Sequence, residues 1–341
     1  MKKLIVLFLT TILCIGALCA CSGGTKITDT RKNIVCTIFP EYDWTKELIK
    51  GKEDEFNLSL LLDNGVDLHN YQPTAEDIIE ISTADLLIYV GGESDGWIED
   101  AIKNATDKDI VVVNLLELVG EDLKEEELVE GMRAPRNEAE DDISHEGDAE
   151  NKENSHGNYE EAPEYDEHVW LSLRNAKKCV QGIESALREV DFEGVDVYTQ
   201  NANQYIKKLE KLDAEYEKAV SNAKTRTILF GDRFPFRYLA DDYGLKYYAA
   251  FLGCSAETEA SFETITFLSS KMDELGLNCI FVLENSDDRI AKTIINNTKM
   301  KEQKIIVIDS LQSVTKKEIE SGATYLGIME DNLLKLKEAL D

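Results

Sequence analysis

The chain has 341 residues and a formal net charge of −30, and 43% of its residues are hydrophobic. So acidic a chain excludes nucleic acid as a partner, because the phosphates of nucleic acid need a basic surface. An excess of carboxylates instead draws cations toward the protein. The length suits two domains.

Residues 1–20 predict a secretory signal. Lys2 and Lys3 precede an apolar run from Leu4 to Leu18, which is the usual order of a signal peptide. The run is shorter than the roughly 20 residues that span a bilayer. Leu18-Cys19-Ala20-Cys21 resembles a bacterial lipoprotein box, which implies a lipid on Cys21 and a flexible tether over 21–30. The alternative is an ordinary cleaved signal with an incidental cysteine.

Short apolar runs alternate with helical stretches over residues 31–190, and this rhythm predicts an α/β lobe with a parallel sheet. Four runs predict its strands: Ile34–Phe39, Phe56–Leu62, Leu86–Val90 and Ile110–Val113. Four strands are enough for one small sheet with helices on both faces.

An acidic segment interrupts this lobe at about 121–166. It is crowded with Asp and Glu and has few large apolar residues, so it cannot bury enough surface to fold and predicts a disordered loop. His145 and His156 lie in it, and they are two of only four histidines in the chain. We expect the loop to collect metal ions weakly.

A long helix follows over residues 191–223. Tyr205, Leu209, Leu212 and Tyr216 recur at spacings of three and four, which is one apolar stripe of an amphipathic helix. At 1.5 Å per residue such a helix spans roughly 40 Å and can run along two lobes.

The strand rhythm returns over residues 224–341, in the runs Thr227–Phe230, Tyr247–Ala250, Cys279–Leu283 and Ile305–Ile308. The predicted fold is therefore α/β, with two Rossmann-like lobes, each a four-stranded parallel sheet flanked by helices, joined by one long helix. Open α/β sheets bind ligands at the carboxyl ends of their strands.

Four side chains could hold a metal ion, and three of them lie at the carboxyl end of a predicted strand. His69 follows the second predicted strand, and His168 follows the acidic segment. Asp232 follows the first strand of the second lobe and Asp309 its fourth. Two imidazoles with carboxylates suit zinc, manganese or another divalent first-row ion. For a single histidine, a surface or hydrogen-bonded role is the alternative.

Three segments around these residues carry a family resemblance. They are Gly65-Val66-Asp67-Leu68-His69-Asn70-Tyr71-Gln72-Pro73-Thr74, Asp166-Glu167-His168-Val169-Trp170-Leu171 and Asp309-Ser310-Leu311. They resemble, in the same order, the metal-ligand segments of the receptor proteins of bacterial ABC importers for zinc and manganese. The resemblance extends from about Val35 to the end of the chain. It implies that His69, His168 and Asp309 bind the metal. An acidic, histidine-bearing loop before the second histidine is typical of the zinc-binding members.

The resemblance fails at one ligand. Family members have a histidine or glutamate after the strand that is predicted to end at Phe230, whereas this chain has Gly231-Asp232-Arg233. Asp232 is the nearest substitute, although it could instead pair with Arg233 or cap the next helix. Glu257, Glu259 and Cys254 are other possible donors. We expect Arg233 to turn toward an acidic neighbour, because a free cation beside the metal is unfavourable.

The resemblance implies a monomeric, lipid-anchored receptor on the extracytoplasmic face of the cell membrane that delivers zinc to a membrane permease. Two histidines with two carboxylates lean toward manganese, but the histidine-bearing loop favours zinc. A surface adhesin on this scaffold is an alternative. An enzyme such as a metallohydrolase is disfavoured, because the sequence has no His-Glu-x-x-His, Gly-x-Ser-x-Gly or phosphate-binding glycine motif.

Overall fold

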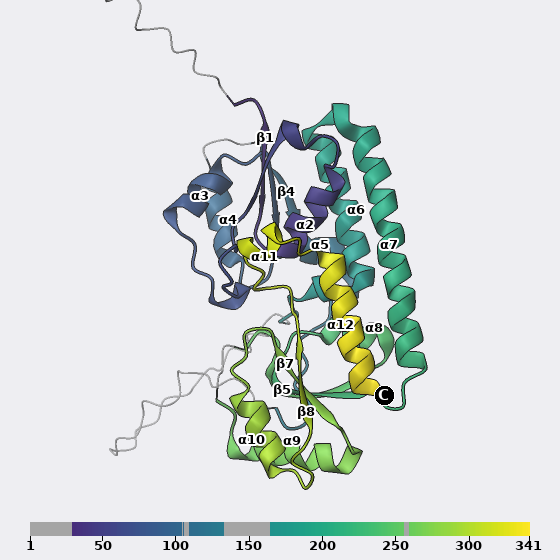
Figure 1. Cartoon of the computed structure of the whole chain (residues 1–341). Coiled ribbons are helices and arrows are strands. Elements are labelled where there is room, and N and C mark those ends of the chain that lie inside the picture. Colours follow the sequence, from purple (N-terminus) through teal and green to yellow (C-terminus); the bar gives the residue numbers. More distant parts are fainter. Residues whose placement is uncertain (1–28, 104, 106–108, 133–163, 256–258) are drawn as a thin grey trace, which may run out of the picture. The chain divides into compact units, whose positions relative to one another are not determined.

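The computed structural model describes residues 29–103, 105, 109–132, 164–255 and 259–341 (Figure 1). The predicted signal and the predicted lipid site, Cys21, lie outside the described residues. So do His145, His156 and Glu257. Within the described ranges, none of the helices combines the length and the apolar character needed to cross a membrane.

The first half of the chain forms a four-stranded parallel sheet in the order β2-β1-β3-β4. Its strands are β1 (Lys32–Cys36), β2 (Phe56–Leu60), β3 (Leu86–Tyr89) and β4 (Val111–Asn114). The helices of this half are α2 (Phe39–Leu48), α3 (Ala75–Ser82), α4 (Gly96–Lys103), α5 (Leu115–Val119) and α6 (Leu173–Val190). Figure 1 shows α3 and α4 on one side of the sheet and α2 and α6 on the other.

The second half repeats the plan with the order β6-β5-β7-β8, again all parallel. Its strands are β5 (Thr227–Phe234), β6 (Lys246–Leu252), β7 (Cys279–Leu283) and β8 (Lys304–Ile308). The helices are α8 (Arg237–Tyr243), α9 (Phe262–Leu275), α10 (Arg289–Asn297), α11 (Lys316–Glu320) and α12 (Tyr325–Leu340). The prediction of two four-stranded parallel sheets flanked by helices is confirmed.

The long helix is α7 (Val195–Ser221), and the predicted stripe of Tyr205, Leu209, Leu212 and Tyr216 is buried along it. It contacts both halves of the chain. The side-chain amide of Asn201 donates to the carbonyl of Leu48 (2.8 Å), and the hydroxyl of Tyr216 donates to that of Met329 in α12 (2.7 Å).

Strand β5 is longer than predicted. It continues through Gly231-Asp232-Arg233 to Phe234, with a shift of register between Phe230 and Arg233. The aromatic side chains explain the extension, because Phe234 stacks on Tyr247 of β6, with ring centroids 3.8 Å apart. Asp232 therefore lies inside a strand, at a bulge, and not beyond the strand end as predicted.

The ends of the acidic segment also differ from the expected loop. Glu125 and Tyr165 form an antiparallel bridge, and the backbone N–H of Asp166 donates to the carbonyl of Lys124 (2.9 Å). The hydroxyl of Tyr238 in α8 accepts from the backbone N–H of Lys124 (3.1 Å) and donates to the carbonyl of Asp166 (2.8 Å). The two ends are thus fixed beside each other, next to His168.

Candidate metal centre

His69 lies on the helical turn Leu68–Asn70, which follows β2. Asp67 caps this turn, because its carboxylate accepts the backbone N–H of His69 (3.0 Å). Burial, and then the neighbouring His168, lower the pKa of His69 to about 3. The ring is therefore neutral at physiological pH, which is the form that binds metals.

His168 is fully buried and immediately precedes the turn Val169–Leu171. Its backbone N–H and its ring Nδ1 both lie within hydrogen-bond distance of Oδ1 of Asp166, at 2.8 and 2.9 Å. A carboxylate only accepts, so Nδ1 carries the proton and Nε2 presents a lone pair. The carboxylate thus fixes both the tautomer and the direction of the ring, as in the usual outer shell of a metal-binding histidine.

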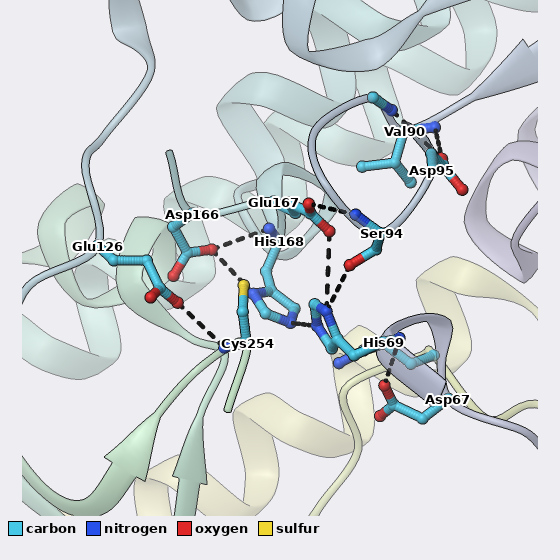
Figure 2. A network of polar contacts seen from close by, with 12 residues as sticks. Asp67, His69, Val90, Ser94, Asp95, Glu126, Asp166, Glu167, His168 and Cys254 are labelled. Carbon is cyan, nitrogen blue, oxygen red and sulfur yellow. Dashed lines mark hydrogen bonds and ion pairs between the residues drawn. The ribbon is translucent and has the colours of Figure 1, made fainter. Parts of the chain in front are cut away.

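The two imidazoles face each other, with Nε2 of His69 3.0 Å from Nε2 of His168 (Figure 2). Because Nε2 of His168 has no proton, Nε2 of His69 has to donate one in the metal-free protein. The hydroxyl of Ser94, 2.8 Å from Nδ1 of His69, then donates to that nitrogen. Two nitrogens bound to one tetrahedral zinc at 2.0–2.1 Å lie roughly 3.3 Å apart, so a metal fits this pair with little movement.

The loop after β3 contacts the Nδ1 side of the His69 ring through Ser94. The backbone N–H of Ser94 donates to Oε1 of Glu167 (3.0 Å), whose Oε2 lies 3.8 Å from Nδ1 of His69. Gly92 has a φ of 91°, and a Cβ there would clash with Oε1 of Glu167. Glycine is therefore required for the close approach of this loop to Glu167. If a metal took the lone pair of Nε2 of His69, the ring proton would be on Nδ1, where the hydroxyl of Ser94 could accept its hydrogen bond.

Cys254, from the second half of the chain, lies beside the pair of His69 and His168. One ring nitrogen of His69, one of His168 and the sulfur of Cys254 all lie within 4.8 Å of one another. The backbone N–H of Cys254 donates to Oε1 of Glu126 (3.1 Å). Burial, and then Asp166, Glu126 and Glu167, raise the pKa of the Cys254 thiol far above its usual value, so the thiol is neutral without a metal.

Arg233 pairs with Asp67, as expected of a cation near this centre. Burial opposes ionisation of Asp67, but Arg233 and His69 together outweigh it and hold the pKa of Asp67 below its usual range. The same carboxylate caps the turn of His69. The arginine therefore helps to position His69 through Asp67.

Neither of the two predicted carboxylate ligands belongs to the group of His69, His168 and Cys254 that the described residues form. Asp232 accepts the backbone N–H groups of Arg233 (2.8 Å) and Leu283 (3.2 Å). Asp309 accepts the N–H of Leu311 (2.8 Å). Burial, and then Asp309, raise the pKa of Glu284 to about 7, so Asp309 is the neighbour of another carboxyl group.

Of the remaining candidates, Glu259 alone lies in the described part of the chain, and it is not a member of this group. Glu259 is exposed, and Glu257, His145 and His156 lie outside the described residues. Sequence reasoning did not select Ser94, Glu126 or Glu167. Ser94 could have been found, because it follows β3 at the carboxyl edge of the sheet. Glu167 stands beside His168 in the chain, but which way its side chain turns depends on the loop of Gly92.

The family model described as ZnuA, zinc-uptake complex component A, periplasmic, matches residues 34–339. The zinc-binding protein AdcA of Streptococcus pyogenes serotype M3 is 29% identical over 100% of this chain, and the zinc-binding lipoprotein AdcA of Streptococcus pneumoniae is 30% identical. The chain covers 62% of the length of each. The high-affinity zinc uptake system protein ZnuA of Bacillus subtilis is 28% identical, over 93% of this chain and 90% of its own length.

Solved structures give the same likeness. The Zn(II)-bound ZnuA-like domain of Streptococcus pneumoniae AdcA matches with a TM-score of 0.67 and 26% identity, over 91% of this chain and 99% of that one. The metal-dependent lipoprotein YcdH of Bacillus subtilis matches with a TM-score of 0.69 and 27% identity, over 91% and 100%.

Two buried carboxyl groups lie behind the loop of Ser94. Asp95 accepts the backbone N–H groups of Val90 (2.8 Å) and Gly91 (3.3 Å), and burial raises its pKa to about 7. Burial, and then Asp95, raise the pKa of Glu41 well above its usual range. Within the described part of the chain, Oδ1 of Asp95 and Oε1 of Glu41 have no hydrogen-bond partner.

The raised pKa of Asp95 predicts a pH dependence of stability. The folded state holds a proton that the unfolded state, with a pKa near 3.8, has lost. The free energy of unfolding of the metal-free protein should therefore fall as pH rises from about 4 to about 7, by at most about 1.4 kcal/mol per pH unit from this group. The variant Asp95→Asn keeps an acceptor for Val90 and Gly91 and should flatten the fall.

Urea unfolding at several pH values measures this effect. The exposed Asp54 provides the control, and Asp54→Asn should keep the wild-type slope. An unchanged slope in Asp95→Asn would show that Asp95 titrates normally in the folded protein.

Proposed function

We propose that this chain is a monomeric receptor that captures zinc and delivers it to an ABC importer. The reason is its family, because the chain belongs to the zinc-uptake complex component A family. The members of this family are components of an uptake complex and not enzymes, which agrees with the prediction from the sequence. The chain would therefore bind and release its ion without changing it chemically.

The observation that carries this proposal is the facing pair of His69 and His168. Their Nε2 atoms lie 3.0 Å apart, and each ring has a polar partner at its Nδ1. A zinc ion would replace the proton between the two nitrogens and accept both lone pairs. Neutral imidazoles with polar partners on their far nitrogens are the usual zinc ligands.

The surroundings of the pair favour zinc over manganese. Manganese prefers carboxylate and other oxygen donors, but the carboxylates of Asp232 and Asp309 are bound to backbone N–H groups. A manganese receptor would need these carboxylates at the ion. The AdcA relatives are zinc-binding proteins, and a Zn(II)-bound structure is among the similar folds, which adds support for zinc.

The variant His168→Ala tests the central role of the pair. Zinc affinity should fall by at least about 100-fold, beyond the usual cost of losing an outer-shell partner, because a direct ligand is lost. Titration calorimetry on the full chain measures it. His156→Ala replaces a histidine of the acidic segment and should leave the tight site unchanged. Wild-type zinc affinity in His168→Ala would refute the proposed site.

We also propose that the acidic segment at about 121–166 collects zinc weakly, through His145, His156 and its carboxylates, and so raises its concentration near the histidine pair. Deleting residues 137–161 should remove weak zinc equivalents from a titration and keep the tight one. If the weak equivalents persist at full stoichiometry, the segment does not collect the ion.

We further propose that a lipid on Cys21 anchors the receptor to the extracytoplasmic face of the cell membrane. A relative, AdcA of Streptococcus pneumoniae, is a lipoprotein. Each buried methylene of an acyl chain contributes about 0.8 kcal/mol to membrane binding. The variant Cys21→Ser should therefore move the protein from the membrane fraction to the soluble fraction of a bacterial host. Equal membrane retention of both forms would argue against a lipid anchor.

A further inference from the structure

We propose that the sulfur of Cys254 is a direct zinc ligand, which completes with His69 and His168 a two-nitrogen, one-sulfur set. This inference rests on the proposed function, because it names a third donor for the same ion. It replaces Asp232, the substitute predicted from the sequence, with a thiolate from the loop after β6.

The positions of the three donor atoms suit a single ion. The sulfur of Cys254 and one ring nitrogen of each histidine lie within 4.8 Å of one another, and Figure 2 shows the sulfur beside the ring of His168, with the ring of His69 facing that of His168. In tetrahedral zinc with Zn–S near 2.3 Å and Zn–N near 2.0–2.1 Å, a sulfur and a nitrogen lie roughly 3.6 Å apart. The longest distance between the sulfur and these ring nitrogens therefore exceeds the zinc-site value by at most about 1.2 Å.

The loop that carries Cys254 is packed directly against His168. A Cβ on Gly253 would lie 3.2 Å from Cε1 of His168, 3.3 Å from Oδ2 of Asp166 and 2.9 Å from the carbonyl oxygen of Phe234. Glycine thus lets the backbone approach the imidazole. The hydrogen bond from the N–H of Cys254 to Glu126 then fixes the next residue on the side of the histidine pair.

The charges balance when the ion binds. The reaction is Zn²⁺ plus Cys254–SH giving Zn–S–Cys254 and a proton released to solvent. The thiolate and the carboxylate of Asp166 behind His168 together offset the two charges of the ion.

A sulfur donor has two consequences for the receptor. Thiolate is a soft ligand that suits zinc and does not suit manganese, so Cys254 would set the selectivity of the site. Cys254 also belongs to the second half of the chain, whereas both histidines belong to the first. A bound zinc would therefore link the two lobes through one metal–sulfur bond.

X-ray absorption at the zinc edge, on the full chain loaded with one equivalent of zinc, tests the inference. We expect one sulfur at about 2.3 Å in addition to nitrogen or oxygen donors near 2.0–2.1 Å. The sulfur signal should be lost in Cys254→Ser and kept in Cys279→Ser, a control at another half-buried free cysteine. The ratio of zinc affinity to manganese affinity should fall at least about 10-fold in Cys254→Ser and stay unchanged in the control.

A wild-type spectrum without sulfur overturns the inference, and it does so whether or not the Cys254→Ser variant folds. A sulfur signal that persists in Cys254→Ser also overturns it. In both cases the proposed function stands if His168→Ala still abolishes tight zinc binding. X-ray absorption therefore tests the sulfur ligand, and titration calorimetry on His168→Ala separately tests the proposed function.

Discussion

The described architecture around the candidate centre depends on two buried imidazoles whose Nε2 atoms face each other at 3.0 Å. Two bare lone pairs at that distance repel, so either a proton or a cation has to lie between them. Buried polar groups are stable only when they are paired, and Asp166 and Ser94 provide that pairing on the far nitrogens. In the metal-free protein a proton lies between the two rings, and the proposed zinc ion would take its place.

The residues around His168 also hold the two halves of the chain together. The indole N–H of Trp170 donates to the carbonyl of Ser310 (2.9 Å), and the hydroxyl of Tyr325 donates to the carbonyl of Trp170 (2.7 Å). Tyr238 binds the carbonyl of Asp166 from α8. All these partners come from the second half. A small movement of His168 when zinc binds would therefore change the hydrogen bonds to the other lobe directly. That coupling suits a receptor whose loaded state is recognised by a permease.

Much of the fold was predictable from the sequence. Alternating apolar runs predicted the parallel strands, and a stripe of four apolar residues predicted α7. The resemblance based on three motifs is confirmed by the family match, and His69 and His168 do lie together. Asp232 could not be placed, since the bulge in β5 depends on Phe234 stacking against Tyr247. Cys254 was one donor among several, because only the packing of Gly253 on His168 shows which way its loop runs.

The most direct test of the account is a crystal structure of the zinc-loaded protein, with anomalous scattering measured on both sides of the zinc edge. The account predicts one strong peak within about 2.0–2.1 Å of Nε2 of both His69 and His168. A strong peak beside Asp309 and Glu284, with the two imidazoles still hydrogen-bonded to each other, would contradict it.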